Sequence, residues 1–292
     1  MHLAAAAYPL TWFDHFDDFA AHLAHWVADA AGQGAQLLTF PEYGAMELTS
    51  LGGRAVAENL EAGLHEVARW KPALDALHVE LAARHGVYIL GASGPVFTGT
   101  RPVNRATLYG PDGIVGHQDK QIMTRFERET WDVVAGTGLA PFDTDLGRIG
   151  VVICYDSEFP LLARSLVEAG AEILLAPSCT DSLAGFTRVR VGSMARALEN
   201  QCVVVHSPTV GLCDFCPAVD ENVGAASIYG PPDRGFPPTG ILAETALNAP
   251  GWAMAKISLE AIREVRRDGG VLNHAHWPEQ IERLTQASIP HR

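Results

Sequence analysis

The chain has 292 residues, of which 48% are hydrophobic and 19% are charged, so it can bury a sizeable core as one large domain or two ordinary ones. Its formal net charge of −13 argues against nucleic acid or an anionic membrane as a partner. No apolar run is long enough to cross a bilayer, and the N-terminal residues do not resemble a signal peptide. The five cysteines are not arranged as a disulfide framework, which predicts a protein of the reducing cytoplasm.

The N-terminal part of the chain alternates predicted strands and helices. Short apolar runs predict strands at 3–8, 36–40, 87–90, 105–109 and 114–117. Apolar residues at helical spacing predict a helix over 16–30 that ends near Gly32. Two more helices are expected, one over about 57–70 and a second that Pro72 opens and that continues to 85. A turn at 111–113 joins the last two strands, so this region ends in a meander.

Cys154 stands between a predicted buried strand and the predicted start of a helix. The β-branched run 151–153 suits the strand, and Ser157 can cap a helix whose apolar positions repeat over 159–167. The cysteine is therefore expected at the carboxyl end of a strand, where α/β proteins place their sites and where helix amide dipoles favour a thiolate. The alternative at this position is a buried structural cysteine.

The C-terminal half continues the alternation of strands and helices. Strands are expected at 172–176, 202–206, 241–244 and 253–259, with a helix over 186–200 between the first two. The Gly- and Pro-rich stretch 210–238 predicts long surface connections around a short strand. No repeat or composition break divides the chain, so we predict a single domain over 1–292, with 260–292 as a C-terminal arm. The alternation predicts a layered α/β fold with a mixed sheet.

Three residues with complementary chemistry, Glu42, Lys120 and Cys154, each lie just beyond a predicted strand. A carboxylate can take the proton of a cysteine nucleophile and later return it to a leaving amine. A lysine ammonium can balance a thiolate and stabilise the oxyanion of a tetrahedral intermediate, and the backbone amide of Tyr155 can donate a second hydrogen bond to that oxyanion. These residues predict an acyl-transfer site that needs neither histidine nor metal. The alternative is a structural ion pair between the glutamate and the lysine.

Short motifs along nearly the whole chain accompany these three residues. They are Phe40-Pro41-Glu42, His117-Gln118-Asp119-Lys120, Val152-Ile153-Cys154-Tyr155-Asp156 with Phe159-Pro160, Ala176-Pro177-Ser178, the run from Ala195 to Asn200, and Gly240-Ile241-Leu242. In these motifs the chain resembles the nitrilase superfamily of carbon–nitrogen hydrolases. The resemblance implies that Glu42 is the general base, that Lys120 stabilises the oxyanion and that Cys154 is the nucleophile.

The resemblance also implies a fold, an assembly and a further site residue. The fold is a four-layer α-β-β-α sandwich, which forms a homodimer or a higher homo-oligomer through helices that include the one after the cysteine, where Leu161, Arg164 and Ser165 would face outward. Many members carry a second glutamate that orients the lysine, and both Glu127 and Glu129 are available here. Glu129 is our choice, because it lies six residues before Ala135-Gly136, where the family often has Pro-Gly.

The other cysteines leave alternatives open. Cys213 and Cys216 have the spacing of half a zinc site or of a redox pair, but the chain has no second Cys-x-x-Cys, so a metal is not favoured. Cys179 follows another predicted strand, where it either lines the site or packs in the core. We therefore expect no cofactor and no metal.

The predicted function is hydrolysis of a non-peptide carbon–nitrogen bond, with a small carboxamide giving a carboxylate and ammonia through a thioester. Tyr155-Asp156 after the cysteine resembles the amidase-like branches, whereas the nitrilase branch usually has Trp-Glu there. An N-carbamoyl amide or a nitrile is the alternative substrate. A catalytically silent binding protein of the same fold is the alternative from another class, although all three site residues are present. The expected partner is a small-molecule amide, with no nucleic acid or membrane involved.

Overall fold

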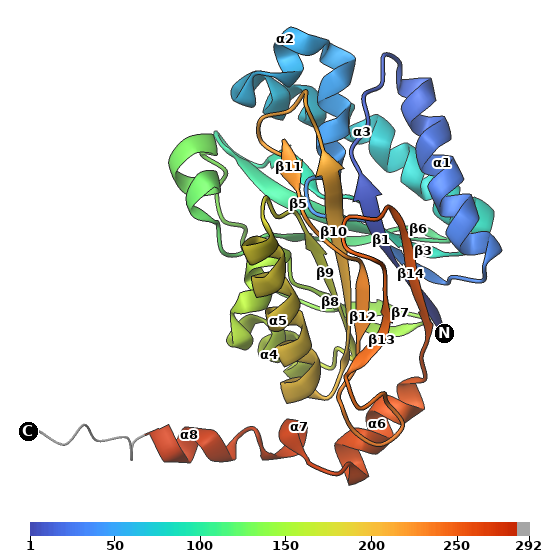
Figure 1. Ribbon diagram of the computed structural model, residues 1–292, viewed down its shortest axis with the longest axis vertical. Coiled ribbons are helices and arrows are strands. Elements are labelled where there is room, and N and C mark those ends of the chain that lie inside the picture. Colours follow the sequence, from blue (N-terminus) through green and yellow to red (C-terminus); the bar gives the residue numbers. More distant parts are fainter. Residues whose placement is uncertain (285–292) are drawn as a thin grey trace, which may run out of the picture.

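The computed structural model describes residues 1–284, and the last part of the predicted C-terminal arm, 285–292, lies outside the described residues. Figure 1 shows strands that form two sheets, with helices on the outer side of each sheet. The arrangement is an α-β-β-α sandwich, which confirms the predicted fold class. No helix within residues 1–284 is long and apolar enough to cross a membrane.

The first sheet places two of the predicted site residues at one edge. It contains β14 (Gly251–Lys256), β1 (His2–Pro9), β2 (Leu37–Thr39), β3 (Tyr88–Leu90), β5 (Pro102–Gly110), β4 (Gly94–Phe97) and β6 (Gly113–Asp119). The strands β1, β2 and β3 are parallel, and β6 runs in the same direction because β5 is antiparallel to both β3 and β6. Glu42 follows β2 and Lys120 follows β6, so both leave the carboxyl edge of this sheet.

The second sheet contributes the cysteine from its own carboxyl edge. It contains the parallel strands β8 (Gly147–Val151), β9 (Ile173–Ser178) and β10 (Val203–Leu212), with β7 (Phe142–Thr144), β11 (Glu221–Asn222), β12 (Ser227–Tyr229) and β13 (Ile241–Glu244) paired antiparallel at the sides. The two sheets join where β1 pairs in parallel with β10, at Tyr8 with Thr209 and Pro9 with Val210. Because β1 and β10 run in the same direction, the carboxyl edges of both sheets meet.

The alternation of side chains in β1 shows how the layers are separated. Leu3, Ala5 and Ala7 lie in the core between the two sheets, while Ala4, Ala6 and Tyr8 lie in the core beneath the outer helices. This alternation is expected because successive side chains of a strand point to opposite faces. A third core lies between the second sheet and its outer helices, so every sheet face is covered by apolar packing.

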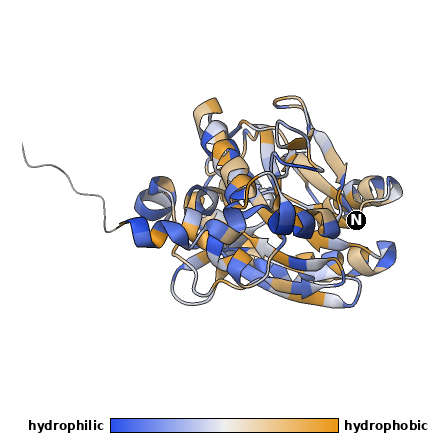
Figure 2. Ribbon diagram, turned by 90° about the horizontal axis from the view of Figure 1, so that it is seen from below, coloured by the Kyte–Doolittle hydropathy of each residue, from blue (hydrophilic) through white to orange (hydrophobic). Residues whose placement is uncertain are grey.

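Helices complete the four layers. The first sheet is covered by α1 (Phe16–Gly32) and α3 (Leu60–His85), and the second by α4 (Pro160–Glu168) and α5 (Leu183–Asn200). Shorter elements are the 3-10 helix η1 (Gly44–Gly52), α2 (Arg54–Ala57), and the C-terminal α6 (Leu259–Asp268), α7 (Asn273–His276) and α8 (Glu279–Leu284). Figure 2 shows α7 and α8 as a largely hydrophilic extension from the body, which agrees with the absence of buried residues in both.

The predicted pair of helices on either side of Pro72 is wrong, because α3 is one continuous helix with Pro72 inside it. The proline cannot donate to the carbonyl four residues earlier and normally ends or kinks a helix. Here the buried residues on both sides of it, Leu64, Val67, Leu74 and Leu81, pack on the same core, so tertiary packing outweighs the local preference.

The stretch 210–238 was expected to form surface connections, but much of it is buried. Strand β10 continues to Leu212, and Cys213, Phe215 and Cys216 then pack in the core that contains α1 and α3. The Gly and Pro content of this stretch indicates turns correctly, but turns can also pack inward where their apolar side chains find a core.

The helix after the cysteine begins later than predicted. Ser157 is not its cap, because Cys154–Glu158 forms a separate 3-10 turn, η3, and α4 begins at Pro160. Leu161 is exposed as expected, but Arg164 is buried rather than outward-facing. Its Nε donates to Glu168 Oε1 at 2.9 Å, and its guanidinium lies 4.9 Å from the ring centre of Trp277.

Candidate active site

The Cys154 turn holds the cysteine in a backbone conformation that is uncommon for a residue with a side chain. Its φ angle is +49°, in the left-handed region, where strain is usually maintained by the surrounding structure. Ser157 Oγ donates to the carbonyl oxygen of Cys154 at 2.6 Å, and Asp156 N donates to Ile153 O at 2.9 Å. The Sγ atom lies 3.7 Å from the carbonyl oxygen of Cys179, at the end of β9. The turn thus brings the thiol to the place where the two sheets meet.

Glu42 is fully buried and accepts hydrogen bonds from three directions. Its Oε1 accepts from Lys120 Nζ at 2.7 Å and from Asn104 Nδ2 at 3.0 Å, while its Oε2 accepts from the backbone N–H of Cys179 at 3.0 Å. The first two partners come from the first sheet and the third from the second sheet. The carboxylate therefore lies between the sheets, beside the residue whose carbonyl contacts Cys154 Sγ.

Lys120 lies between two carboxylates. Its Nζ donates to Glu42 Oε1 and also to both oxygens of Glu127, at 2.9 and 2.7 Å. Its side chain is only 1% exposed, so these contacts replace the water that an ammonium ordinarily keeps. The structure thus brings together the three predicted residues Glu42, Lys120 and Cys154, and adds a fourth.

The fourth residue is Glu127, and the choice of Glu129 as the lysine-orienting glutamate is wrong on geometry. Glu129 forms an exposed ion pair with Arg125, at 2.9 Å. Glu127 instead begins the π-helix η2 (Glu127–Trp131), where its Oε2 accepts from Thr124 N and Thr124 Oγ1, each at 2.8 Å. Thr-x-x-Glu is the sequence pattern of a capping box, and this signal could have identified Glu127.

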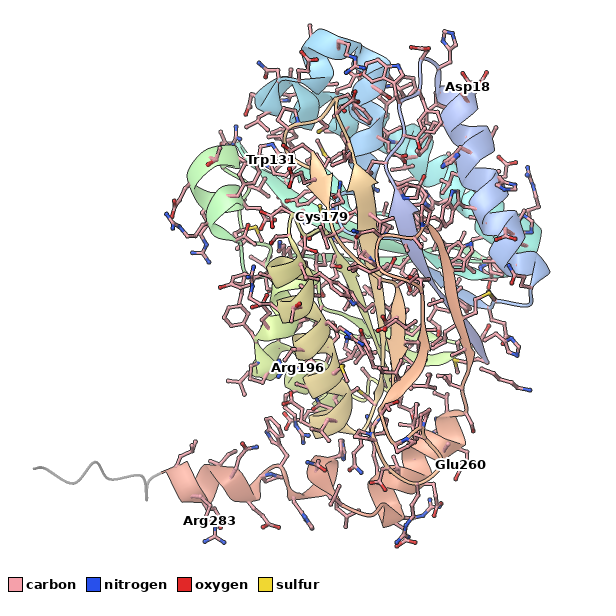
Figure 3. All side chains as sticks on the ribbon, viewed as in Figure 1. Asp18, Trp131, Cys179, Arg196, Glu260 and Arg283 are labelled. Carbon is pink, nitrogen blue, oxygen red and sulfur yellow. The ribbon has the colours of Figure 1, made fainter. Side chains whose placement is uncertain are left out.

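A cavity of about 580 Å³ opens above these residues. Glu42, Lys120, Glu127 and Cys154 are among the residues that line it. Trp131 and Cys179, labelled in Figure 3, line it from η2 and from the end of β9. Tyr155 lines it too, with its ring packed edge-on against Phe159 at 4.9 Å between ring centres. The volume of the cavity is within the ordinary range of small-molecule sites.

Comparison with known proteins shows the family. The family model of carbon–nitrogen hydrolases matches residues 3–267. The chain belongs to the carbon–nitrogen hydrolase family. The probable hydrolase YhcX of Bacillus subtilis is 33% identical over 256 residues, which are 88% of this chain and 49% of that protein. Omega-amidase NIT2 of Danio rerio is 27% identical over 219 residues, which are 70% of this chain and 72% of the relative.

Other relatives and a solved structure agree with this assignment. Deaminated glutathione amidase of Bos taurus is 34% identical over 148 residues, which are 50% of this chain and 42% of that protein. The chain spans about half or less of the length of the first curated relatives it matches. A carbon–nitrogen hydrolase from Helicobacter pylori G27 has the same fold, with a TM-score of 0.73, 20% identity, and coverage of 98% of this chain and 96% of the other.

The charges in the candidate site are set by burial and by the lysine. Burial raises the pKa of Glu42 to about 7, although the Lys120 ammonium opposes this change. Burial also disfavours the charged forms of Lys120 and Glu127, but their mutual attraction outweighs it, so the pKa of Lys120 is raised and that of Glu127 is lowered. The lysine and Glu127 are therefore charged at neutral pH, and Glu42 is close to its midpoint.

The surroundings of Cys154 disfavour the thiolate form of its side chain. Burial first, and then the Glu42 carboxylate, raise the pKa of its thiol well above the usual value. The expectation that helix amides favour a thiolate is wrong for a physical reason, because α4 begins only at Pro160 and its first turn is separated from the cysteine by η3. A thiol acts as a nucleophile only after it loses its proton, and the Glu42 carboxylate lines the same cavity as Cys154.

Sequence reasoning also missed residues that hold Glu42 and Glu127 in place. Tyr43 Oη donates to Glu127 Oε1 at 2.7 Å, and Asn104 Nδ2 contacts Glu42 as described. Asp156, one of the motif residues, accepts from backbone N–H groups on both sides of the site. Tyrosine, asparagine and aspartate of this kind have no spacing signal, because their partners are distant in sequence.

Cys213 and Cys216 are not among the residues that line the cavity with Cys154. Both are buried free thiols in the core that contains α1 and α3. Within the part of the chain that the structure describes, no group of three or more His, Cys, Asp or Glu side chains is arranged to hold a metal ion. Cys179 has two roles here, because it lines the cavity and its backbone N–H donates to Glu42.

Proposed function

We propose that this protein hydrolyses a small linear carboxamide to a carboxylate and ammonia through a thioester on Cys154. The observation that carries the proposal is the Lys120 ammonium, which bridges Glu42 and Glu127 among the residues that line the same cavity as Cys154. Such an arrangement supplies a base, a nucleophile and a fixed positive charge in a buried site. An N-carbamoyl compound or a nitrile is the alternative substrate.

The first half of the proposed reaction forms the thioester. Cys154 Sγ attacks the carbonyl carbon while Glu42 takes the thiol proton, and the carbonyl oxygen becomes an oxyanion near Lys120 and the Tyr155 N–H. The tetrahedral intermediate then expels the nitrogen, which leaves as ammonia after Glu42 returns the proton. The C–S bond replaces the C–N bond, and Glu42 is again a carboxylate.

The second half hydrolyses the thioester. The oxygen of a water molecule attacks the thioester carbon while Glu42 takes a proton from that water. The Lys120 ammonium stabilises the second oxyanion. The intermediate breaks its C–S bond, and the proton on Glu42 returns to the Cys154 sulfur. The products are a carboxylic acid, which ionises, and the free enzyme. Glu127 takes no proton in this scheme and only fixes Lys120.

Two observations support an amide rather than a nitrile. Tyr155-Asp156 after the nucleophile resembles the amidase-like branches of the family. The similar proteins include an omega-amidase, and a structure of an amidase from Nesterenkonia sp. AN1 shows acrylamide added at the active-site cysteine. Omega-amides of dicarboxylic acids are the leading substrates, followed by N-carbamoyl compounds. A cytoplasmic location is part of the proposal and is supported by five free cysteines.

The test is a panel of amides, N-carbamoyl compounds and nitriles with matched side chains, followed by ammonia release. We expect the highest kcat/KM for an amide, a mass-spectrometric adduct on the wild type, no adduct with Cys154→Ala, and no effect of a chelator. Ammonia release about tenfold faster from the nitrile than from its matched amide would overturn the substrate choice. Binding of the panel compounds without any turnover would instead support the catalytically silent alternative.

A further inference from the structure

One buried carboxylate that the reaction scheme does not use connects two separate parts of the site. Asp156 is 1% exposed. Its Oδ1 accepts from the backbone N–H groups of Gln121 at 3.2 Å and Ile122 at 2.8 Å. Its Oδ2 accepts from Gln121 N at 3.1 Å and from Ile153 N at 3.3 Å. All of these partners are backbone amides rather than side-chain cations.

The positions of these amides relative to the catalytic groups are informative. Gln121 and Ile122 directly follow Lys120. They belong to the segment 120–127, which begins at Lys120 and ends at Glu127. Ile153 directly precedes Cys154, and Asp156 itself belongs to the Cys154 turn. A single carboxylate therefore joins the segment that carries the lysine and its second glutamate to the turn that carries the nucleophile.

The two parts it joins differ in how they are held. The backbone of Lys120 is fixed to the first sheet, because its N–H donates to Asn104 O at 2.9 Å. The Cys154 turn leaves the second sheet with a positive φ angle that the surroundings must maintain. The link through Asp156 crosses from one sheet to the other close to the reacting thiol.

We infer that Asp156 is a positioning residue, which holds the segment 120–127 against the Cys154 turn and so sets where Lys120 lies relative to the thiol. The inference rests on the proposed function. A carboxylate suits the task because all of its lone pairs can accept from N–H groups. Replacement by an amide puts an NH2 group against backbone donors and removes the charge, so the link is broken without loss of volume.

Protonation should break the link in the same way. Burial raises the pKa of Asp156 to about 6, although the amides of Gln121 and Ile122 and the Lys120 ammonium oppose this change. With this raised pKa, Asp156 takes up a proton and loses its negative charge as pH falls through about 6. Glu42, with a pKa of about 7, must also be unprotonated to act as a base. Log kcat/KM of the wild type should therefore fall with slope one below about pH 7 and approach slope two below about pH 6.

The variant test compares Asp156→Asn with a matched control, Asp233→Asn. Asp233 also accepts from backbone amides, those of Arg234 and Gly270, both at 2.7 Å, but it lies outside the cavity lining. With a chosen amide at pH 8, Asp156→Asn should lower kcat about 10²-fold with a smaller change in KM, because a misplacement of about 1 Å has that effect. The control should keep the wild-type kcat.

A second readout does not depend on the substrate. The rate of Cys154 alkylation by iodoacetamide should fall at least about tenfold in Asp156→Asn, because a displaced Lys120 no longer favours the developing thiolate. If the wild type releases ammonia from no panel compound, the proposed function fails, whereas this alkylation comparison still decides the positioning role. Circular dichroism checks that each variant is folded.

The outcomes decide the inference in either direction. Wild-type kcat and alkylation rate in a folded Asp156→Asn protein would overturn it. If that variant does not fold, the wild-type pH profile still decides, because a slope that stays at one down to pH 5 in folded protein would also overturn it. Loss of the second unit of slope in Asp156→Asn, with the first retained, is the result we expect.

Discussion

The protonation states of the site residues depend more on their contacts with one another than on the ordinary pKa of each side chain. Lys120 stays charged in a buried position because two carboxylates contact it. The pKa of one of them, Glu42, is about 7, because burial raises it and the Lys120 ammonium opposes this change. A buried charge without such partners would cost several kcal/mol or would neutralise. Each member of the group therefore influences the protonation of the next, which supports the proposed role of Glu42 as a base.

The first prediction concerns the base. Glu42→Gln keeps the shape of the side chain but removes its ability to take a proton, so kcat/KM should fall by about 10²–10⁴. In the wild type, kcat/KM should decrease as pH falls through about 7, because protonated Glu42 cannot accept the thiol proton. The measurement is kcat/KM against pH for one amide. An unchanged rate in Glu42→Gln would show that its contact with Lys120 is only structural.

At the scale of elements, the sequence predicted the site strands well and the local helix details poorly. The apolar runs before Glu42 and Lys120 do form strands, because fully buried strands have a strong composition signal. The run 151–153 before Cys154 is only partly a strand, because β8 ends at Val151. The interior Pro72 of α3 and the late start of α4 were not predictable in this way. In both cases packing across the chain, or a local 3-10 turn, outweighs the pattern of neighbouring residues.

Helix η2 shows why the second glutamate was assigned to the wrong residue. The choice of Glu129 relied on its distance from Ala135-Gly136, but a spacing of residues does not fix which side of a helix faces the site. Two residues apart on a helix, Glu127 and Glu129 point in different directions. The bonds between Thr124 and Glu127 decide which of them turns toward Lys120.

The second prediction tests this difference with a matched pair. Glu127→Gln removes one of the two carboxylates on Lys120, and because the buried ammonium is then poorly compensated, the variant should lose about 3–5 kcal/mol in free energy of unfolding. Its kcat should also fall. Glu129→Gln breaks only an exposed ion pair, so it should change stability by less than about 1 kcal/mol and leave kcat unchanged.

Urea denaturation and kcat for one amide, measured on both variants, check this prediction. Equal losses of activity in the two variants would contradict the geometry of the site. A larger loss in Glu129→Gln than in Glu127→Gln would restore the original choice.

At the scale of the whole molecule, the layers were predictable from the alternation of strands and helices and from the family resemblance, but the junction of the two sheets was not. That junction consists of the pairing of Tyr8 and Pro9 with Thr209 and Val210, about 200 residues apart in the chain. So short a pairing of distant segments leaves no periodic signal. It nevertheless brings Glu42 and Cys154 to one place, because the carboxyl edges of the two sheets meet there.

The last prediction is self-association. Large apolar side chains are exposed on α4 and α5, with exposed fractions of 70% for Leu161, 60% for Val191 and 43% for Leu198. Exposed apolar side chains on neighbouring helices are typical of a surface that meets its symmetry mate, and a stable pair buries about 1,600 Å².

We therefore expect a homodimer by light scattering at micromolar concentrations. Leu161→Glu should shift the mass toward the monomer, because two carboxylates would face each other across a two-fold axis. The matched control is Leu212→Glu, whose side chain is 79% exposed at the end of β10, away from these helices. It should leave the mass unchanged. A wild-type monomer across this range would contradict the prediction, and a dimer that survives Leu161→Glu but not Leu212→Glu would move the interface to the other end of the sheet.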